Sequence, residues 1–237
     1  MRYHALIPAA GGGARFGADP PKQYSLLDGR PVLLHAMERL AASLPLYMTY
    51  VVLANDDHWF DRAIGARERV TALRCGGATR AETVRNALNV LTDIASDDWI
   101  VVHDAVRPCV DAASIMRLQR ELADDHTGGL LAIPIACSLK RVDDDNRIVG
   151  TEPRAGLWRA QTPQMFRYKV LREAFAQAGI EQMTDDAQVV EALGRQPRLV
   201  VGNPNNLKIT YPDDLLLAAA ILSPGLIPSQ RIAVTCA

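Results

Sequence analysis

The sequence predicts an α/β fold with a mainly parallel twisted sheet, and three observations lead to that class. Short apolar runs alternate along the chain with helix-like segments of about 10–15 residues, which is typical of parallel strands joined by helical crossovers. Several runs are continuously apolar, as expected for strands covered on both faces. The composition, 49% hydrophobic and 22% charged over 237 residues, is that of a globular protein.

The strands are expected where the apolar runs fall, at 3–8, 47–54, 69–75, 98–104 and 128–135, with shorter ones at 197–202 and 207–210. The helices are expected at 31–44, 79–91, 112–123, 169–179, 184–194 and 212–222. Pro31 suits the first turn of its helix. Leu33, Met37, Leu40 and Leu44 then recur at spacings of four, three and four, which places them on one helix face.

Residues 136–160 break the alternation. Two short segments flank "DDDN" at 143–146, which is typical of a polar hairpin turn. We expect a single domain over 1–222 with a projecting β-arm at about 136–158, and such arms commonly pack on a partner subunit. A surface hairpin that contacts nothing is the alternative. Residues 223–237 are expected to form a weakly ordered tail.

Composition also excludes classes of function. A net charge of -1 argues against a nucleic-acid coat or a polybasic membrane patch. The four cysteines form no Cys-x-x-Cys pair and no zinc-type cluster, which favours reduced thiols in a cytoplasm. No apolar run approaches the roughly 18 residues of a membrane span, so a cytoplasmic protein is expected.

The loop "PAAGGGARFGADPPKQY" at 8–24 follows the first strand and matches neither common phosphate-binding motif. A dinucleotide-binding G-x-G-x-x-G pattern fails at Phe16, and a P-loop fails because Ala18 and Asp19 stand where Lys and Ser/Thr are required. Its backbone amides can still form an anion-binding nest beside Arg15 and Lys22. A tight turn with solvated charges is the alternative.

Ligands of such sheets bind beyond the carboxyl ends of the strands. This rule brings "PAAGGGAR", "CGGATRAET" and "VHDAVRP" to one crevice. Together with "NNLKIT", these blocks resemble the 2-C-methyl-D-erythritol 4-phosphate cytidylyltransferases of the non-mevalonate isoprenoid pathway, in order from near residue 3 to near residue 222.

The resemblance implies a Rossmann-like nucleotidyltransferase fold and a reaction of CTP with methylerythritol phosphate that releases pyrophosphate. It implies Mg²⁺ or another divalent cation, and a homodimer in which the β-arm completes the neighbour's site. It assigns catalysis to Arg15, Lys22 and Lys208. Cations are needed because both substrates are anionic, whereas a phosphate nucleophile needs no general base. A solvated lysine at a strand end is the alternative for Lys208.

The resemblance also implies two binding sets. The nucleotide-binding set is Pro8, Ala9, Ala10, Gly11, Gly12, Gly13, Gly76, Gly77, Ala78, Thr83 and Asp104. The acceptor-binding set is Asp104, Ala105, Arg107, Ser138, Arg154, Thr162, Thr184 and Lys208.

Particular residues in these sets are expected to act as follows. Asp104 is a hard oxygen ligand suited to magnesium. Arg154, on the arm, has the planar fork that pairs with phosphate. Some relatives carry aspartate at position 78, so Ala78 is harmless only if the main chain reads the base. Thr79 is expected to cap the helix that follows, and His103 to be structural.

Three other functions remain open from the sequence. A cytidylyltransferase for another polyol phosphate, such as ribitol 5-phosphate, would share the loop, the lysines and the aspartate. A sugar-phosphate uridylyltransferase is disfavoured by "GGATRAET". A non-catalytic nucleotide-binding protein is disfavoured because Arg15, Lys22 and Lys208 are all present.

Overall fold

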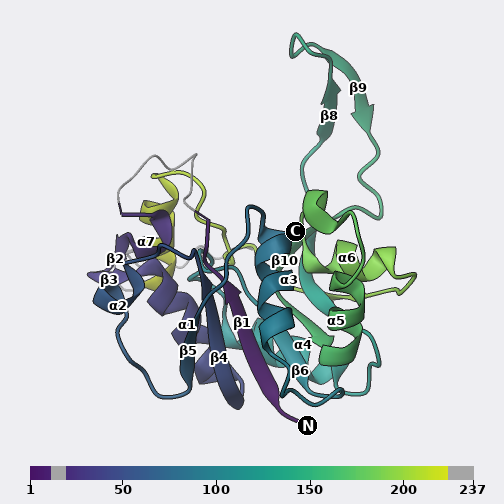
Figure 1. Cartoon of the computed structure of the whole chain (residues 1–237). Coiled ribbons are helices and arrows are strands. Elements are labelled where there is room, and N and C mark those ends of the chain that lie inside the picture. The colour runs from purple at the N-terminus through teal and green to yellow at the C-terminus, as the bar shows by residue number, and fades with distance from the viewer. Residues whose placement is uncertain (12–19, 224–237) are drawn as a thin grey trace.

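The computed structural model describes residues 1–11 and 20–223, and in that part of the chain a seven-stranded sheet lies between two layers of helices (Figure 1). The strands are β1 (Tyr3–Pro8), β4 (Leu46–Leu53), β5 (Val70–Arg74), β6 (Trp99–Val102), β7 (Gly128–Pro134), β10 (Trp158–Arg167) and β11 (Arg198–Val201). Their order is β11-β7-β10-β6-β1-β4-β5. Every neighbouring pair described is parallel except those of β10, which runs antiparallel to β6 and β7. The predicted α/β class with a mainly parallel sheet is confirmed.

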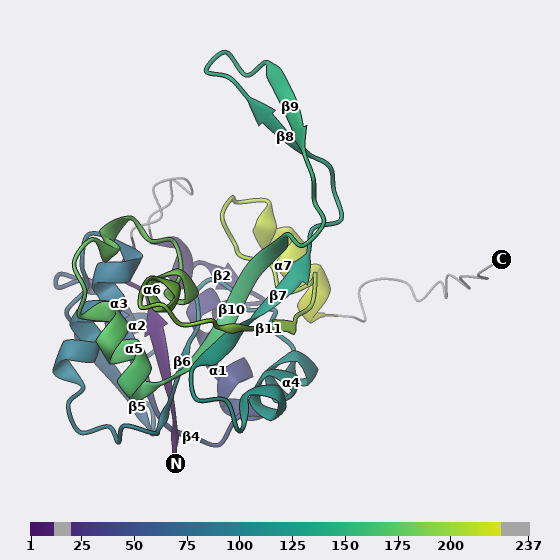
Figure 2. The same cartoon turned by 90° about the vertical axis from the view of Figure 1, so that its right-hand side faces the viewer.

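The helices are α1 (Val32–Ser43), α2 (Phe60–Ala63), α3 (Arg80–Val90), α4 (Ala112–Leu122), α5 (Tyr168–Phe175), α6 (Asp186–Ala192) and α7 (Asp214–Leu222), with 3₁₀ turns at Lys22–Tyr24 and Ile180–Gln182. Alternate residues of β1 enter different cores, as the two-residue period of a strand requires. Ala5 and Ile7 pack with α1 and α4 on one face, whereas Leu6 packs with α3, α5 and α6 on the other (Figure 2). The sheet is therefore buried on both faces.

At least three segments differ from the sequence-based expectation. β10 falls in a stretch where no strand was predicted, because Gln161, Pro163 and Gln164 interrupt any apolar run. Pro163 lacks an N–H group, and the register between β10 and β7 shifts between Ala160 and Gln164. The strand predicted at 207–210 is wrong, since those residues are irregular. The four-residue helix α2 was not predicted either.

The arm is a two-stranded hairpin of β8 (Leu139–Val142) and β9 (Ile148–Glu152) that projects from the body (Figure 1). The backbone N–H of Asn146 donates to the carbonyl of Asp143, and Asn146 takes a positive φ of 62°, so the predicted polar turn is present. A smaller hairpin pairs β2 (Leu26–Leu27) with β3 (Arg30–Pro31), and α7 packs against β2.

Some predicted features lie outside the described residues. They are Gly12, Gly13 and Arg15 of the first loop, and residues 224–237 of the expected tail. Among residues 1–11 and 20–223, no helix has the length and apolar character to cross a membrane.

Candidate active site

A hollow of about 280 Å³, here called the central hollow, lies beyond the carboxyl ends of β1, β5 and β6. Its lining is Pro8, Ala9, Ala10, Gly11, Lys22, Gln23, Gly77, Ala78, Thr79, Arg80, Thr83, Asp104, Ala105, Val106 and Lys208. The three sequence blocks expected to share a crevice therefore do so, as far as the described residues extend.

The loop after β5 is shaped by Thr79 and Thr83 at the start of α3. Thr79 accepts from the Glu82 N–H, and Glu82 accepts in return from the Thr79 N–H, which completes a capping box. The Thr83 hydroxyl donates to the Thr79 carbonyl at 2.9 Å and accepts from the Gly77 N–H at 3.1 Å. That hydroxyl therefore fixes the loop from which the backbone of Gly77 and Ala78 faces the central hollow.

Gly76 lies behind this loop rather than in the lining. A Cβ at position 76 would stand 2.3 Å from the Ala10 Cβ and 2.8 Å from the Leu53 carbonyl oxygen. Only glycine lets the loop after β5 approach the loop after β1 this closely. Gly76 thus sets the width of the central hollow.

Gly76→Ala is therefore expected to lower the free energy of unfolding by about 1–3 kcal/mol, as overpacking does. It should also raise about tenfold the KM for CTP, the nucleotide that the sequence resemblance implies. Gly150→Ala is the matched control, since a Cβ at position 150 meets no atom within 4 Å. Thermal melts and initial rates check both. A Gly76→Ala protein with the melting temperature and KM of the Gly150→Ala control would contradict this account.

Two of the four lysines of the chain, Lys22 and Lys208, line the central hollow. The Lys22 ammonium donates to the Ile209 carbonyl at 3.3 Å. The Ile209 N–H donates to the Val106 carbonyl at 2.9 Å, which holds the segment that carries Lys208 against the loop after β6. Both predicted lysines therefore converge on one place, although 207–210 is not a strand.

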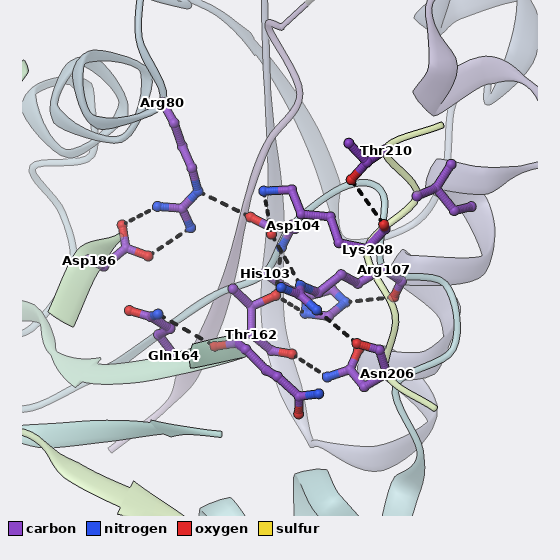
Figure 3. Close-up of polar contacts among 12 residues, drawn as sticks. Arg80, His103, Asp104, Arg107, Thr162, Gln164, Asp186, Asn206, Lys208 and Thr210 are labelled. Atoms are coloured by element: carbon purple, nitrogen blue, oxygen red, sulfur yellow. Dashed lines mark hydrogen bonds and ion pairs between the residues drawn. The ribbon is translucent and has the colours of Figure 1, made fainter. Parts of the chain in front are cut away.

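Asp104 lies where the central hollow meets a second hollow, and three cations surround its buried carboxylate (Figure 3). Arg80 Nε lies 3.1 Å from Oδ1, while Arg107 Nε and Lys208 Nζ lie 3.2 and 3.1 Å from Oδ2. Burial acts to raise the pKa of Asp104, but Arg80, Lys208 and Arg107 outweigh it and hold that pKa well below its ordinary value. The carboxylate is therefore ionised at neutral pH.

The second hollow, here called the side hollow, measures about 210 Å³. Its lining is Arg80, Asp104, Arg107, Ala160, Gln161, Thr162, Gln164, Thr184, Asp185 and Lys208. It thus contains five of the predicted acceptor residues, namely Asp104, Arg107, Thr162, Thr184 and Lys208. Ala105 lines the central hollow instead.

His103 and Thr162 support Asp104 from behind. His103 Nε2 lies 3.1 Å from the Arg107 carbonyl oxygen, an acceptor only, so Nε2 carries the proton. Burial lowers the pKa of His103 to about 4, so Nδ1 is unprotonated at neutral pH and accepts from the Thr162 hydroxyl at 3.0 Å. The same hydroxyl accepts from the Asp104 N–H at 3.0 Å. As predicted for His103, these contacts are structural.

Ser138 and Arg154 do not join the other predicted acceptor residues. Both lie exposed on the arm, and neither lines the central or the side hollow of this chain. The Arg154 guanidinium donates to the Ala136 carbonyl across the base of the arm.

Arg80 is the residue that sequence reasoning missed. It lines both hollows and pairs with Asp104 and with Asp186, which is 106 positions away in the chain. One signal was available in the sequence. Arg80 follows the cap residue Thr79, and a cation at a helix N-terminus opposes the helix dipole, so it requires a specific anionic partner.

Among the described residues, no group of three or more His, Cys, Asp or Glu side chains is placed to hold a metal ion. Asp104 offers one carboxylate whose oxygens already face three cations. These donors do not fit an all-protein metal cage. They fit a cation whose other ligands are phosphate oxygens, the usual arrangement for Mg²⁺.

A larger hollow of about 580 Å³ lies at the amino ends of β4 and β5. Apolar residues of α1, of the following loop and of the two strands line it, together with the charged residues Glu38, Arg67, Glu68 and Arg69. None of the predicted site residues lines it.

Comparisons with known proteins agree on one family. The sequence profile of the 2-C-methyl-D-erythritol 4-phosphate cytidylyltransferase family matches residues 3–224. Relatives of that name from Dechloromonas aromatica and Nitrosospira multiformis are 51% and 50% identical over 224 and 227 residues, which cover 93% and 94% of this chain and 97% and 98% of the relatives.

Solved structures are similar as well. One described as 4-diphosphocytidyl-2C-methyl-D-erythritol synthase has a TM-score of 0.82 at 37% identity and covers 93% of this chain and 98% of its own. The 2-C-methyl-D-erythritol 4-phosphate cytidylyltransferase of Francisella tularensis has a TM-score of 0.80 at 33% identity, covering 93% and 100%.

Proposed function

Because this chain belongs to the family of 2-C-methyl-D-erythritol 4-phosphate cytidylyltransferases, we propose that it transfers the cytidylyl group of CTP to the phosphate of 2-C-methyl-D-erythritol 4-phosphate. The products are 4-diphosphocytidyl-2-C-methyl-D-erythritol and pyrophosphate. The observation that carries this proposal is the pair of adjoining hollows that share Arg80, Asp104 and Lys208. CTP occupies the central hollow and the acceptor phosphate enters from the side hollow.

Cytidylyl transfer requires cations near the phosphates rather than a general base. An oxygen of the acceptor phosphate attacks the α-phosphorus of CTP, and the bond to the bridging oxygen breaks, so pyrophosphate leaves with the electron pair. The attacking oxygen is already anionic near neutral pH, since the second pKa of a phosphate monoester is about 6. Lys22 and Lys208, with Arg15 from the first loop, hold the triphosphate and take up the charge that develops on the leaving group.

The nucleotide and acceptor are recognised by different kinds of group. The backbone of Gly77 and Ala78 contacts the cytosine, so an aspartate at position 78 is unnecessary. Arg107 and Thr184 face the acceptor in the side hollow. Asp104 would hold a divalent cation together with oxygens of the phosphates, and that cation would supply neutralisation of the phosphate charge.

Pyrophosphate release with CTP and magnesium tests the function. We expect a strong preference for methylerythritol phosphate over ribitol 5-phosphate and glucose 1-phosphate at equal concentration, and for CTP over UTP. Preference for ribitol 5-phosphate would overturn the acceptor, and preference for UTP would overturn the nucleotide. No release with any acceptor, from folded protein, would contradict the enzymatic proposal.

We also propose that two copies of the chain form a homodimer through the arm. Three features support this. Ser138 and Arg154 contribute to neither hollow of their own chain, the arm projects from the body (Figure 2), and it exposes Ile148 and Val149 at 65% and 60%. A projecting hairpin with exposed apolar side chains is suited to packing on a second copy. Light scattering at catalytic concentrations measures the assembly, and a monomeric mass would overturn this part of the proposal.

Arg154→Ala is expected to raise the KM for methylerythritol phosphate at least tenfold while leaving the KM for CTP within threefold. The reason is that Arg154 would bind the acceptor phosphate of the other copy through its planar fork, a charge-assisted contact worth about 1.5–3 kcal/mol. Arg141→Ala, which removes another arm arginine paired with Glu152 at 2.7 Å, is the control. An unchanged acceptor KM, or an equal rise in the control, would refute the role.

A further inference from the structure

Arg80 makes three charge-assisted contacts that join separate parts of the fold (Figure 3). Its Nη1 and Nη2 donate to the two carboxylate oxygens of Asp186 at 2.9 and 2.8 Å, and its Nε donates to Asp104 at 3.1 Å. The two contacts with Asp186 form a bidentate pair, which fixes the plane of the guanidinium. Because Nε lies in that plane, the contact with Asp186 also fixes the direction of the bond to Asp104.

Asp186 is fully buried and lines neither hollow. It is the first residue of α6, and the next N–H, that of Ala187, donates to the buried Gln164 side chain of β10 at 2.8 Å. The carboxylate is therefore anchored to the sheet and does not face the space where substrates bind. Its charge acts on Arg80.

Asp104 connects the anchored Arg80 to the cations that face the substrates. One carboxylate oxygen faces Arg80, and the other faces Lys208, which lines both hollows, and Arg107, which lines the side hollow. A rotation of the Asp104 carboxylate would displace both of these cations. Because Arg80 fixes Oδ1 of Asp104, it also fixes Oδ2, the oxygen that contacts Lys208 and Arg107.

We propose that Arg80 is a positioning residue for cytidylyl transfer, with Asp186 as its anchor. The bidentate contact with Asp186, here called the clamp, holds the Arg80 guanidinium, which orients Asp104. Asp104 in turn positions Lys208 and Arg107 between the two substrates. This inference rests on the proposed function for its kinetic consequence, but not for the clamp itself. An ion pair that merely ties α3 to α6 would contribute stability without setting the rate of the chemical step.

Asp186→Asn tests the inference, since asparagine keeps the size and one acceptor oxygen but loses the charge and the bidentate contact. We expect kcat to fall about 10- to 100-fold, because a misplacement of about 1 Å can cost a factor near 10². The KM values for CTP and for methylerythritol phosphate should stay within threefold. Asp98→Asn is the matched control, since Asp98 is a buried carboxylate paired with Arg2 before β6 at the other end of the sheet.

A wild-type kcat in Asp186→Asn, or the same loss in Asp98→Asn, would overturn the proposal. Arg80→Lys, which keeps the charge and loses the fork, should lower kcat to a similar extent. The double variant should be no more than threefold worse than either single one, because both substitutions break the same clamp. Multiplicative losses would show independent roles and overturn the inference.

A spectroscopic readout keeps the clamp testable apart from turnover. The Arg80 Nε–H should give an exchange-protected NMR signal in the wild type, identified by its disappearance in Arg80→Lys, and Asp186→Asn should abolish the protection. Lack of a protected signal in the wild type would overturn the clamp. If the wild type formed no product from CTP and methylerythritol phosphate, the proposed function would fail while this measurement still decided whether Arg80 is clamped.

Discussion

Lys22→Ala is expected to lower kcat about 10²- to 10³-fold, the usual cost of removing one preorganised charge donor from a transition state. Lys22 is half-buried at the edge of the central hollow, and its ammonium donates to the Ile209 carbonyl, so its position is set before any substrate binds. The two prolines before it limit the backbone further. A preorganised cation costs little reorganisation when charge develops on the leaving pyrophosphate.

Single-turnover and steady-state rates with saturating CTP measure this effect. Lys169→Ala is the control, because Lys169 is an exposed lysine on α5 that lines neither hollow. We expect the control to keep its rate and both proteins to keep their melting temperature within a few degrees. Turnover of Lys22→Ala within threefold of the wild type would contradict the catalytic role of this lysine.

The parts of the fold that the sequence predicts are those in which local pattern and burial agree. β1, β4 and β6 are continuous apolar runs, and the apolar face of α1 follows directly from its spacing. The crevice at the carboxyl ends of the strands follows from topology, because parallel strands end at one edge of a sheet. This rule places Asp104, two residues after the end of β6, at the crevice without any knowledge of its contacts.

β10 could not be predicted in the same way. Its buried residues include Gln161, Thr162 and Gln164. The side-chain amides of the two glutamines contact backbone groups distant in sequence, those of Asn203 and Ala187. No local pattern reveals that these polar side chains are buried. In the segment 207–210 the opposite error occurs, since an apolar alternation is held in place by the loop after β6 rather than by a neighbouring strand.

The pairing of Asp104 with Arg80 and with Lys208 cannot be predicted from their spacing in the sequence, for the same physical reason. The members of the charge cluster around Asp104 come from α3, from the loop after β6 and from the segment before α7. Ion pairs over such separations depend on tertiary packing, and each partner alone is typical of a solvated surface charge. "TDDA" at 184–187 indicates a helix start, yet only the structure shows that the second aspartate is buried against Arg80.

Asp104→Asn is expected to have the largest combined effect on stability and turnover. Asp104 is 6% exposed, and its carboxylate is shared by Arg80, Arg107 and Lys208, so its loss removes the negative charge that lies among these three cations. Removing one partner of a buried ion pair costs about 3–5 kcal/mol in free energy of unfolding, and the low end applies here because Lys208 is partly solvated. We expect kcat to fall about 10²-fold or more, since Lys208 and Arg107 lose their common anchor.

Ligand addition separates this anchoring role from a simple packing role. The triphosphate of CTP brings negative charge to the same cations, and a ligand that binds only the folded state raises its stability. CTP should therefore raise the melting temperature of Asp104→Asn by more than that of the wild type, although turnover stays low. In Asp98→Asn, whose carboxylate is also buried but lies at the far end of the sheet, CTP should produce the wild-type rise. A smaller rise in Asp104→Asn than in the wild type would mean that Asp104 acts chiefly by contacting the nucleotide, and that the three cations hold their places without it.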